Sequence, residues 1–396
     1  MADEVVISIV EQNLNEGVFI LMKRKKLVTL IGSLCLILVL AAMPFMAACG
    51  PEEVTPTPTP TTPTPTPTPT EVIKWRVQSF YPGGAAKASV LSEPFCNTVR
   101  KLSEGRLDIT PYGSGALVPF GETIDAVSRG TIEGAIWWPA YDIGRNRATT
   151  LFAGSIPFGL KGEQWFSWFT RYGGLEMMEE LYGQWNIKPI GPVDVDPTQI
   201  FLHLKEPAYS LAELKGKTVR MAGIEAEIIK EFGVEPVSLP MSEIYTAFET
   251  GVVEGIEFAD PFNNWSAGFH EIGKYIILPG WHSTAGISFV LVNQDTWNEL
   301  PDDLKYIVEV AAHETVTYQR SSDLLDAAEA MKKFKDYGCE FIRLPDEDLA
   351  ALDEVGQRIL DEYAKDPFFD EVLSSVREFK ELMEEMGELE DVSYKS

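Results

Sequence analysis

The sequence predicts an α/β fold of two similarly built lobes, with a ligand-binding cleft between them. Three observations support this prediction. Strand-like runs alternate with helical patterns, one helix-to-strand segment occurs twice, and about 325 residues follow a low-complexity segment, which is enough for two domains. Two such lobes can close about a hinge and bury a ligand in the cleft.

Residues 1–48 read as an export signal with extra residues ahead of it. A basic cluster, Lys23 to Lys26, stands directly before the apolar run from Leu27 to Met46, as in a secretory signal. The run ends in the letters MAAC, which look like the site at which bacteria attach lipid to a cysteine. We expect lipidation of Cys49 and a translation start at Met22; the alternative for the apolar run is a transmembrane helix.

Residues 49–71 predict a tether that holds the body off a membrane. Proline and threonine alternate in TPTPTPTTPTPTPTPT, which excludes a helix and favours an extended spacer. The formal net charge of the chain is -27, which argues against partners such as nucleic acid or anionic lipid. A site for a small anion must therefore be built from particular cations.

Strands and helices follow in an order typical of α/β proteins. A long helical pattern, Leu300 to Gly338, starts with a proline and acids and ends on a glycine. It is long enough to lie across both lobes, and we expect two more helices, around Asp346 to Ala364 and Phe368 to Met386. The clearest strand-like runs are Trp75 to Phe80, Arg106 to Tyr112, Ile200 to Leu204 and Ile287 to Val292.

The repeated segment is the most informative internal feature. Residues 118–136, VPFGETIDAVSRGTIEGAI, align with residues 239–257, LPMSEIYTAFETGVVEGIE. Both copies predict a proline before a helix, a glycine at which the helix stops, and then a strand; chance similarity is the alternative. The identical pairs are Pro119/Pro240, Glu122/Glu243, Ala126/Ala247, Gly130/Gly251, Glu133/Glu254 and Gly134/Gly255.

Catalytic and metal-binding motifs are absent from the sequence. It contains no GxSxG, HExxH, GxGxxG or P-loop pattern, and its histidines lack metal-ligand spacing. We therefore expect no enzyme, although distant residues can build an active site without a motif. After Cys49 only Cys96 and Cys339 remain, either as one disulfide or as two buried thiols.

Two residues are candidates for binding an anion. Arg220 ends a short extended run in LKGKTVRMAG, and a guanidinium offers a planar donor fork that fits a carboxylate. A surface ion pair is the alternative for Arg220. Tyr141 closes the segment WWPAY after the first repeat, where a loop would face the cleft, although packing in the core is an equal alternative.

Further segments match one known family in their order and spacing: SEGRLDI, PFGL, LKGKTVRMAG, GFHEIGKYIILPGW and VNQDTWNELP. From about Trp75 to beyond Leu300 the chain resembles the DctP-like extracytoplasmic solute receptors of tripartite ATP-independent periplasmic (TRAP) transporters. It is nearest to the branch for 2-oxo acids and related carboxylates. The resemblance implies a periplasmic-binding-protein architecture, and a receptor that delivers a small organic acid to an ion-driven membrane permease without catalysis.

The same resemblance implies roles for five residues. Arg220 takes the position of the carboxylate-binding arginine, Tyr141 that of a tyrosine near the carboxylate, and Gln199 that of a glutamine that touches ligand or metal. Glu257 through its side chain and Phe258 through its backbone carbonyl would hold a calcium or sodium ion. A solvated acid at a strand end is the alternative for Glu257.

The segment PGWHS departs from the family pattern. Where 2-oxo-acid members place a glutamate that binds the cation, this chain has Ser283. Serine offers only a neutral oxygen, so the cation is either bound weakly or absent, with His282 or Ser283 touching the ligand instead. Trp281 of the same segment is a further candidate for ligand contact.

We therefore expect a lipid-anchored receptor at the periplasmic or extracytoplasmic face of the membrane. Its ligand would be a small monocarboxylate, a 2-oxo or hydroxy acid, paired with Arg220. A surface-anchored enzyme for a small acid and a sensory receptor are the alternatives. The expected boundaries are 72–197 plus 286–325 for one lobe, 198–285 plus 326–365 for the other, and 366–396 for a C-terminal helix.

Overall fold

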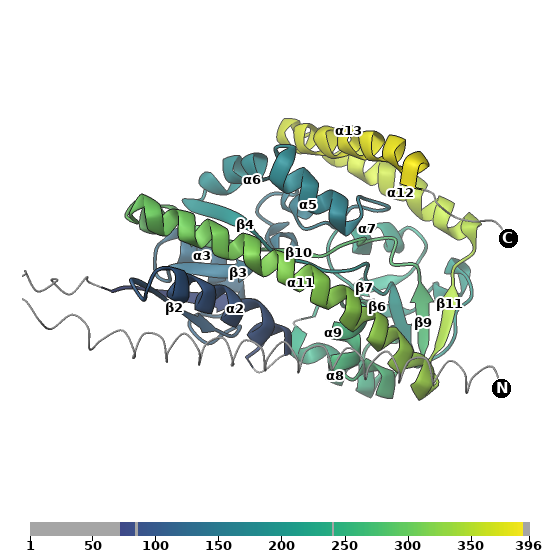
Figure 1. Ribbon diagram of the computed structural model, residues 1–396. Coiled ribbons are helices and arrows are strands. Elements are labelled where there is room, and N and C mark those ends of the chain that lie inside the picture. Colours follow the sequence, from purple (N-terminus) through teal and green to yellow (C-terminus); the bar gives the residue numbers. More distant parts are fainter. Residues whose placement is uncertain (1–71, 84–85, 240, 391–396) are drawn as a thin grey trace, which may run out of the picture. The chain divides into compact units, whose positions relative to one another are not determined.

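Two mixed β-sheets and the helices around them make up the folded body (Figure 1). The computed structural model describes residues 72–83, 86–239 and 241–390, and all of them belong to one unit by their contacts. Helices separate most strands along the chain, and both sheets contain parallel pairs. The prediction of an α/β fold is confirmed.

The first sheet has the strand order β2-β1-β3-β10-β4. β1 pairs in parallel with β2 and β3, whereas β10 runs antiparallel to β3 and β4. Every residue of β10 is buried, as expected for a strand covered on both faces. The strands are β1 (Ile73–Ser79), β2 (Leu107–Tyr112), β3 (Gly134–Trp137), β4 (Ile187–Val195) and β10 (Ile287–Asn293).

The second sheet has the strand order β11-β9-β5-β8-β6-β7. β6 pairs in parallel with β7 and β8, and β5 runs antiparallel to β8 and β9. β11 adds a parallel partner to β9. The strands are β5 (Leu202–Leu204), β6 (Thr218–Arg220), β7 (Glu235–Val237), β8 (Gly255–Ile256), β9 (Tyr275–Leu278) and β11 (Glu340–Arg343).

The two sheets repeat one arrangement. Starting from β2 in the first and from β7 in the second, three parallel strands are followed by an antiparallel strand and its own antiparallel neighbour. Val77 pairs with Gly134 in the first sheet, and Val219 pairs with Gly255 in the second. The repeat in the sequence is therefore a repeat in the structure. Among the strands within the described residues, only β11 has no counterpart in the other sheet.

The repeated glutamates make equivalent hydrogen bonds. The backbone N–H of Arg76 donates to Glu133 Oε2 at 2.6 Å, and that of Thr218 donates to Glu254 Oε2 at 3.1 Å. Arg76 and Thr218 occupy matching positions, each one residue before the valine that pairs with the repeated glycine. Each glutamate thus ties the repeat to its neighbouring parallel strand.

The helix of each repeat stops at a glycine, as predicted. α3 (Thr123–Ser128) and α8 (Met241–Thr250) are followed by Gly130 and Gly251. Their φ angles are +68° and +81°, in the left-handed region that glycine adopts more easily than any other residue. The chain can therefore turn from each helix directly into a strand.

One long helix passes both sheets. α11 (Asp302–Tyr337) has 36 residues, follows Pro301 and ends at Gly338. It packs on β4 and α2 (Ala86–Leu102) at the first sheet, and on α9 (Pro261–Ser266), which follows β8 of the second. Figure 1 shows it as the green helix that runs past both sheets. The predicted helix that spans both lobes is confirmed.

The C-terminal helices also match their prediction. α12 (Asp346–Tyr363) packs on α7 and α13 (Pro367–Glu390) packs on α5, and the two helices contact each other. They form the yellow layer in Figure 1. The remaining α-helices are α4 (Thr149–Phe152), α5 (Gly162–Arg171), α6 (Gly174–Gly183), α7 (Ile224–Lys230) and α10 (Gln294–Asn298).

Cys96 and Cys339 are both free and buried. They lie in different hydrophobic clusters, so the alternative of two buried thiols holds. Burial raises the pKa of the Cys96 thiol to about 12 and also raises that of Cys339, which keeps both in the unreactive thiol form.

The predicted export signal, the lipidation site at Cys49 and the tether at 49–71 lie outside the described residues. Within the part of the chain that the structure describes, no helix combines the length and the apolar character needed to cross a bilayer.

Candidate functional site

A cavity of two adjoining parts, which share five lining residues, lies where four strands end, β1 and β3 of the first sheet and β6 and β8 of the second. Its smaller part, the polar pocket, has about 40 Å³, and its larger part, the apolar chamber, has about 320 Å³. The polar pocket is lined by Phe80, Tyr81, Trp138, Tyr141, Asp196, Gln199, Arg220, Ala222, Met241, Glu257, Phe258, Ala259, Gly286 and Ser288. The apolar chamber is lined by Phe80, Pro82, Ser114, Phe120, Tyr141, Arg220, Ala222, Ser238, Leu239, Met241 and Ser242.

Arg220 is the last residue of β6 and faces both parts of the cavity. Its side chain is almost fully buried, and Nη1 donates to the backbone carbonyl of Glu257 at 2.7 Å and to Glu257 Oε2 at 3.0 Å. Among the described residues Arg220 Nε has no hydrogen-bond acceptor. The guanidinium is therefore held in place from one side, with donor capacity left over.

Glu257 follows β8 directly, so strand pairing places it beside Arg220. The backbone N–H of Glu257 donates to the carbonyl of Arg220 at 2.9 Å, and the side chain is only 5% exposed. Glu257 Oε1 lies 3.7 Å from Nε2 of His282, which is itself fully buried. A buried carboxylate thus balances the arginine charge before any ligand arrives.

A second acid, Glu225, lies near this ion pair in the first turn of α7. Burial raises its pKa well above the ordinary value, and the charge of Glu257 adds to the shift while Arg220 opposes it. This environment favours the neutral acid at Glu225. The net charge of Arg220, Glu257 and Glu225 together is then close to zero.

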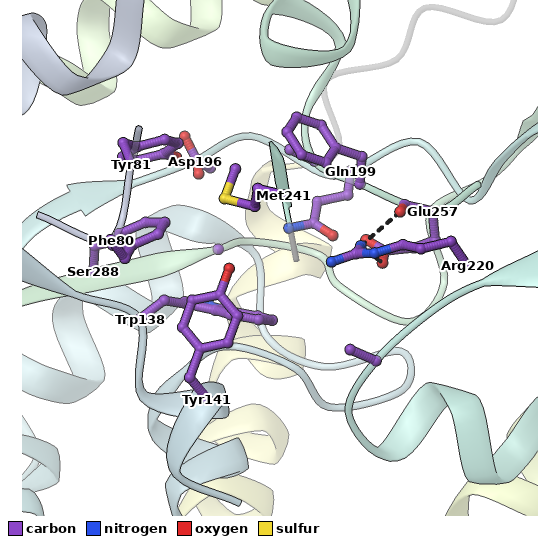
Figure 2. A pocket seen from close by; sticks show the side chains of 14 residues that line it. Phe80, Tyr81, Trp138, Tyr141, Asp196, Gln199, Arg220, Met241, Glu257 and Ser288 are labelled. Carbon is purple, nitrogen blue, oxygen red and sulfur yellow. Dashed lines mark hydrogen bonds and ion pairs between the residues drawn. The ribbon is translucent and has the colours of Figure 1, made fainter. Parts of the chain in front are cut away.

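Tyr141 lies in the short helix η3 (Pro139–Asp142) after β3. Burial raises the pKa of its phenol to about 12, so the hydroxyl keeps its proton and can donate at neutral pH. Its ring packs edge-on against Phe120 at 5.0 Å and Trp138 at 5.1 Å between ring centres. Figure 2 shows the Tyr141 hydroxyl, the Gln199 amide and one guanidinium nitrogen of Arg220 pointing into the same space.

Gln199 is held at the polar pocket through its backbone, and its side chain lies beside Gly286. The backbone N–H donates to the carbonyl of Ser283 at 3.1 Å. A Cβ at Gly286 would lie 3.3 Å from Gln199 Nε2 and 3.2 Å from Asp196 Oδ2. The glycine therefore leaves room for two polar side chains at the pocket wall.

The structure brings together Arg220, Tyr141, Gln199, Glu257 and Phe258 at the polar pocket. Together they offer a cation and neutral donors to a small anion, and oxygen acceptors to a hydroxyl group or a metal ion.

Trp281 and Ser283 lie behind this surface and are not among the residues that line the cavity. The Trp281 ring packs against Phe201 at 5.4 Å between ring centres. The Ser283 hydroxyl donates to the carbonyl of Ala285 at 3.1 Å, so it is already engaged within its own loop.

Sequence reasoning missed several lining residues. Phe80 follows β1 at the position that matches Ala222 after β6, but the repeated segments of the sequence do not include these two strands. Asp196, Met241 and Ser288 carry no local signal either, because the fold brings them to the cavity from separate parts of the chain.

Known proteins resemble this chain along most of its length. The monocarboxylate 2-oxoacid-binding periplasmic protein of Nostoc sp. is 28% identical over 326 residues, which cover 82% of this chain and 88% of that protein. A TRAP transporter solute-binding protein from Bordetella bronchiseptica, solved with copurified calcium and picolinate, is 26% identical with a TM-score of 0.76, covering 81% of this chain and 95% of that one. A TRAP periplasmic solute-binding protein from Colwellia psychrerythraea, solved with calcium and pyruvate, is also 26% identical, with a TM-score of 0.76 and coverage of 81% and 98%.

The family model for DctP, described as bacterial extracellular solute-binding protein, family 7, matches residues 84–366. That range includes every strand of the two sheets except β1, and all the residues that line the polar pocket except Phe80 and Tyr81. Since the match spans well over half of the chain, the protein belongs to the DctP family of TRAP solute-binding receptors, as its sequence resemblance implied.

Proposed function

We propose that this receptor captures a small monocarboxylic acid, a 2-oxo or hydroxy acid, and presents it to a TRAP permease. The observation that carries the proposal is the position of Arg220, buried at a strand end and facing the cavity. The calcium-bound relatives from Bordetella and Colwellia hold picolinate and pyruvate, which are both small carboxylates.

The carboxylate is bound by the guanidinium from the side opposite Glu257. Glu257 engages only Nη1, so the remaining nitrogens can meet two carboxylate oxygens as a fork. The Gln199 amide, which lies beside the guanidinium, and the Tyr141 hydroxyl, which points toward the same space from another direction, donate to the same ligand (Figure 2). Because the arginine is already fixed, little side-chain entropy is lost on binding.

The charge balance of the site favours a bound cation. Glu257 already offsets Arg220, so an incoming carboxylate leaves one excess negative charge in a buried place. The Glu257 carboxylate, the Gln199 amide oxygen and the backbone carbonyl of Phe258 are oxygen donors of the kind that calcium and sodium take. A bound ion would offset the excess charge and bridge to ligand oxygens, and the site is built without Ser283, whose hydroxyl is engaged elsewhere.

The remaining assignments are part of the same proposal. The ligand is held and released unchanged, and the protein is anchored through a lipid on Cys49 at the periplasmic or extracytoplasmic face of the membrane. The lobes at 72–197 plus 286–325 and at 198–285 plus 326–365, with a C-terminal helix at 366–396, close about the ligand. Closure strengthens the pairing with Arg220, because a charge pair removed from water attracts more strongly.

Calorimetric titration with pyruvate and longer 2-oxo acids tests the proposal. We expect Arg220→Ala to weaken binding by ~2–5 kcal/mol, the range for truncating one partner of a buried charge pair, or about thirtyfold and more in affinity. The control is Arg358→Ala, since Arg358 is 59% exposed and pairs with Glu231 on the surface. An unchanged dissociation constant for Arg220→Ala would rule out the arginine as the carboxylate site.

A double variant separates lost binding from lost folding. Arg220→Ala leaves Glu257 buried without its partner, whereas Arg220→Met combined with Glu257→Gln removes both charges of the pair. We expect the double variant to fold and still to bind no 2-oxo acid in the concentration range that saturates the wild type.

A further inference from the structure

The apolar chamber is much larger than the pocket that holds the carboxylate, about 320 Å³ against about 40 Å³. The two parts share Phe80, Tyr141, Arg220, Ala222 and Met241, so a ligand held by Arg220 has open space on its chamber side. A cavity of ~150 Å³ suffices for a benzene ring. A three-carbon acid would fill the polar pocket and leave the chamber to water.

Aromatic rings from separate segments form one wall of the chamber. Phe80 follows β1, Phe120 lies just before α3, and Tyr141 lies after β3. The Tyr141 ring is 5.8 Å from that of Phe80 and 5.0 Å from that of Phe120, between ring centres. Rings held at these spacings offer faces and edges to a planar apolar group.

The opposite wall comes from the second repeat. Leu239 and Met241 stand at the start of α8, and a thioether beside aromatic groups makes favourable contacts and adapts to ligand shape. The chamber is therefore lined by apolar groups on both sides.

The charges of the lining exclude most other ligand classes. Among the described residues that line the chamber, Arg220 is the only charged one, and it lies at the junction with the polar pocket. A second carboxylate or an ammonium group in the chamber would have no partner of opposite charge. The three serines in the lining, Ser114, Ser238 and Ser242, offer neutral hydroxyls, and the last two are exposed.

We propose that the natural ligand is a monocarboxylate with a bulky apolar tail that carries an aromatic ring. The carboxylate pairs with Arg220 in the polar pocket and the tail occupies the apolar chamber. This inference rests on the proposed function, because it takes Arg220 as the anchor of the carboxylate.

Titration of the full chain with three 2-oxo acids tests the tail. Phenylpyruvate is expected to bind more tightly than pyruvate by about tenfold or more, because it buries a ring that pyruvate lacks. 2-Oxoglutarate is expected to bind no more tightly than pyruvate, since its second carboxylate finds no cation. Equal affinities for pyruvate and phenylpyruvate would overturn the chamber assignment and leave the carboxylate site standing, whereas failure of all three acids to bind would overturn both.

A substitution inside the chamber gives an independent test. Ser242→Trp fills the chamber, and we expect it to abolish the preference for phenylpyruvate over pyruvate. The matched control is Glu243→Trp, at the next position of α8, which is exposed and absent from the lining; it should keep the preference. If Ser242→Trp folds with an unchanged thermal midpoint and also keeps the preference, the tail does not lie in the chamber.

Discussion

The two halves of the repeat have the same arrangement of strands, but they place different kinds of side chain at the cavity. In the first sheet, Phe80 directly follows β1 and Trp138 directly follows β3, with Tyr141 just beyond. In the second sheet, Arg220 is the last residue of the matching strand β6, and Glu257 directly follows β8. The first half thus supplies most of the aromatic rings at the cavity, and the second half supplies the ion pair of Arg220 and Glu257.

This difference shows which positions of the repeated unit must keep the same residue and which positions can differ between the two halves. The repeated glycines and glutamates serve the turn and the strand pairing, so they are the same in both halves. The residues at the strand ends and just after them line the cavity, where their side chains take no part in the turn or in strand pairing. Ligand recognition is therefore divided between the halves by a few positions at and just past the strand ends.

The largest expected effect comes from removing a charge in the second half. Glu257→Gln leaves Arg220 buried without a charged partner, and we expect a loss of ~3–5 kcal/mol in the free energy of unfolding, measured by urea denaturation. Glu225→Gln is the matched control, since the environment of Glu225 already favours the neutral acid, and it should cost little. A cost for Glu225→Gln equal to that for Glu257→Gln would mean that the two acids share the charge.

The first half also contains a buried acid, beneath its aromatic wall. Asp142 Oδ2 accepts hydrogen bonds from Trp137 Nε1 and from the Tyr182 hydroxyl, both at 2.9 Å. Burial raises the pKa of Asp142 from 3.8 to about 6, while both hydrogen bonds oppose the shift. The folded state therefore holds this proton more tightly than the unfolded state, and the stability contributed by the protonated acid is lost as the pH rises through about 6.

Asp142→Asn removes this pH dependence and keeps an oxygen acceptor for both donors. Relative to the wild type, the variant is expected to gain about 3 kcal/mol in free energy of unfolding between pH 3.8 and a pH above 6. Denaturation curves at several pH values measure the gain. Asp125→Asn should shift the other way, because a hydrogen bond from Arg145 lowers the pKa of Asp125; a flat difference for Asp142→Asn would contradict the assignment.

The smallest expected effect tests whether the first half, which supplies most of the rings, also donates a hydrogen bond to the ligand. Tyr141→Phe keeps the ring and removes the hydroxyl, and we expect it to weaken binding of a 2-oxo acid by ~0.5–1.5 kcal/mol, the value of one hydrogen bond. Calorimetry measures the change, and Tyr306→Phe serves as the control because Tyr306 is 67% exposed on α11. A loss equal to that of Arg220→Ala would contradict this division, because the hydroxyl from the first half would then contribute as much to binding as the charge from the second half.

The sequence predicted the elements whose signals are local. Neighbouring residues determine where a helix begins and ends. Examples are Gly130 and Gly251 after the helices of the repeat, and the proline and the glycine at the two ends of the long helix. The position of Arg220 at a strand end is equally local, and the family resemblance supplied the role that geometry alone does not give.

The parts that sequence reasoning missed depend on distant segments. Met241 and Phe80 line the same cavity although 160 positions separate them, and no pattern of neighbouring residues encodes such a meeting. Ser283 shows that a position next to a site residue in the sequence need not reach the site. Its chain neighbour His282 lies beside Glu257, yet the loop turns the serine hydroxyl toward Ala285, and only the folded backbone reveals that direction.

The long helix α11 sets a mechanical limit on the receptor. At 36 residues it is ~54 Å long, and a helix resists stretching but tolerates gentle bending. Any rotation of one sheet against the other must therefore bend α11 or move one sheet along it. Near its middle the Thr315 hydroxyl donates to the carbonyl of Ala311 at 2.7 Å, a back-bond of the kind at which helices bend. A bend at this turn would let β4 and α9, which both pack on α11, change their relative angle while the helix stays unbroken.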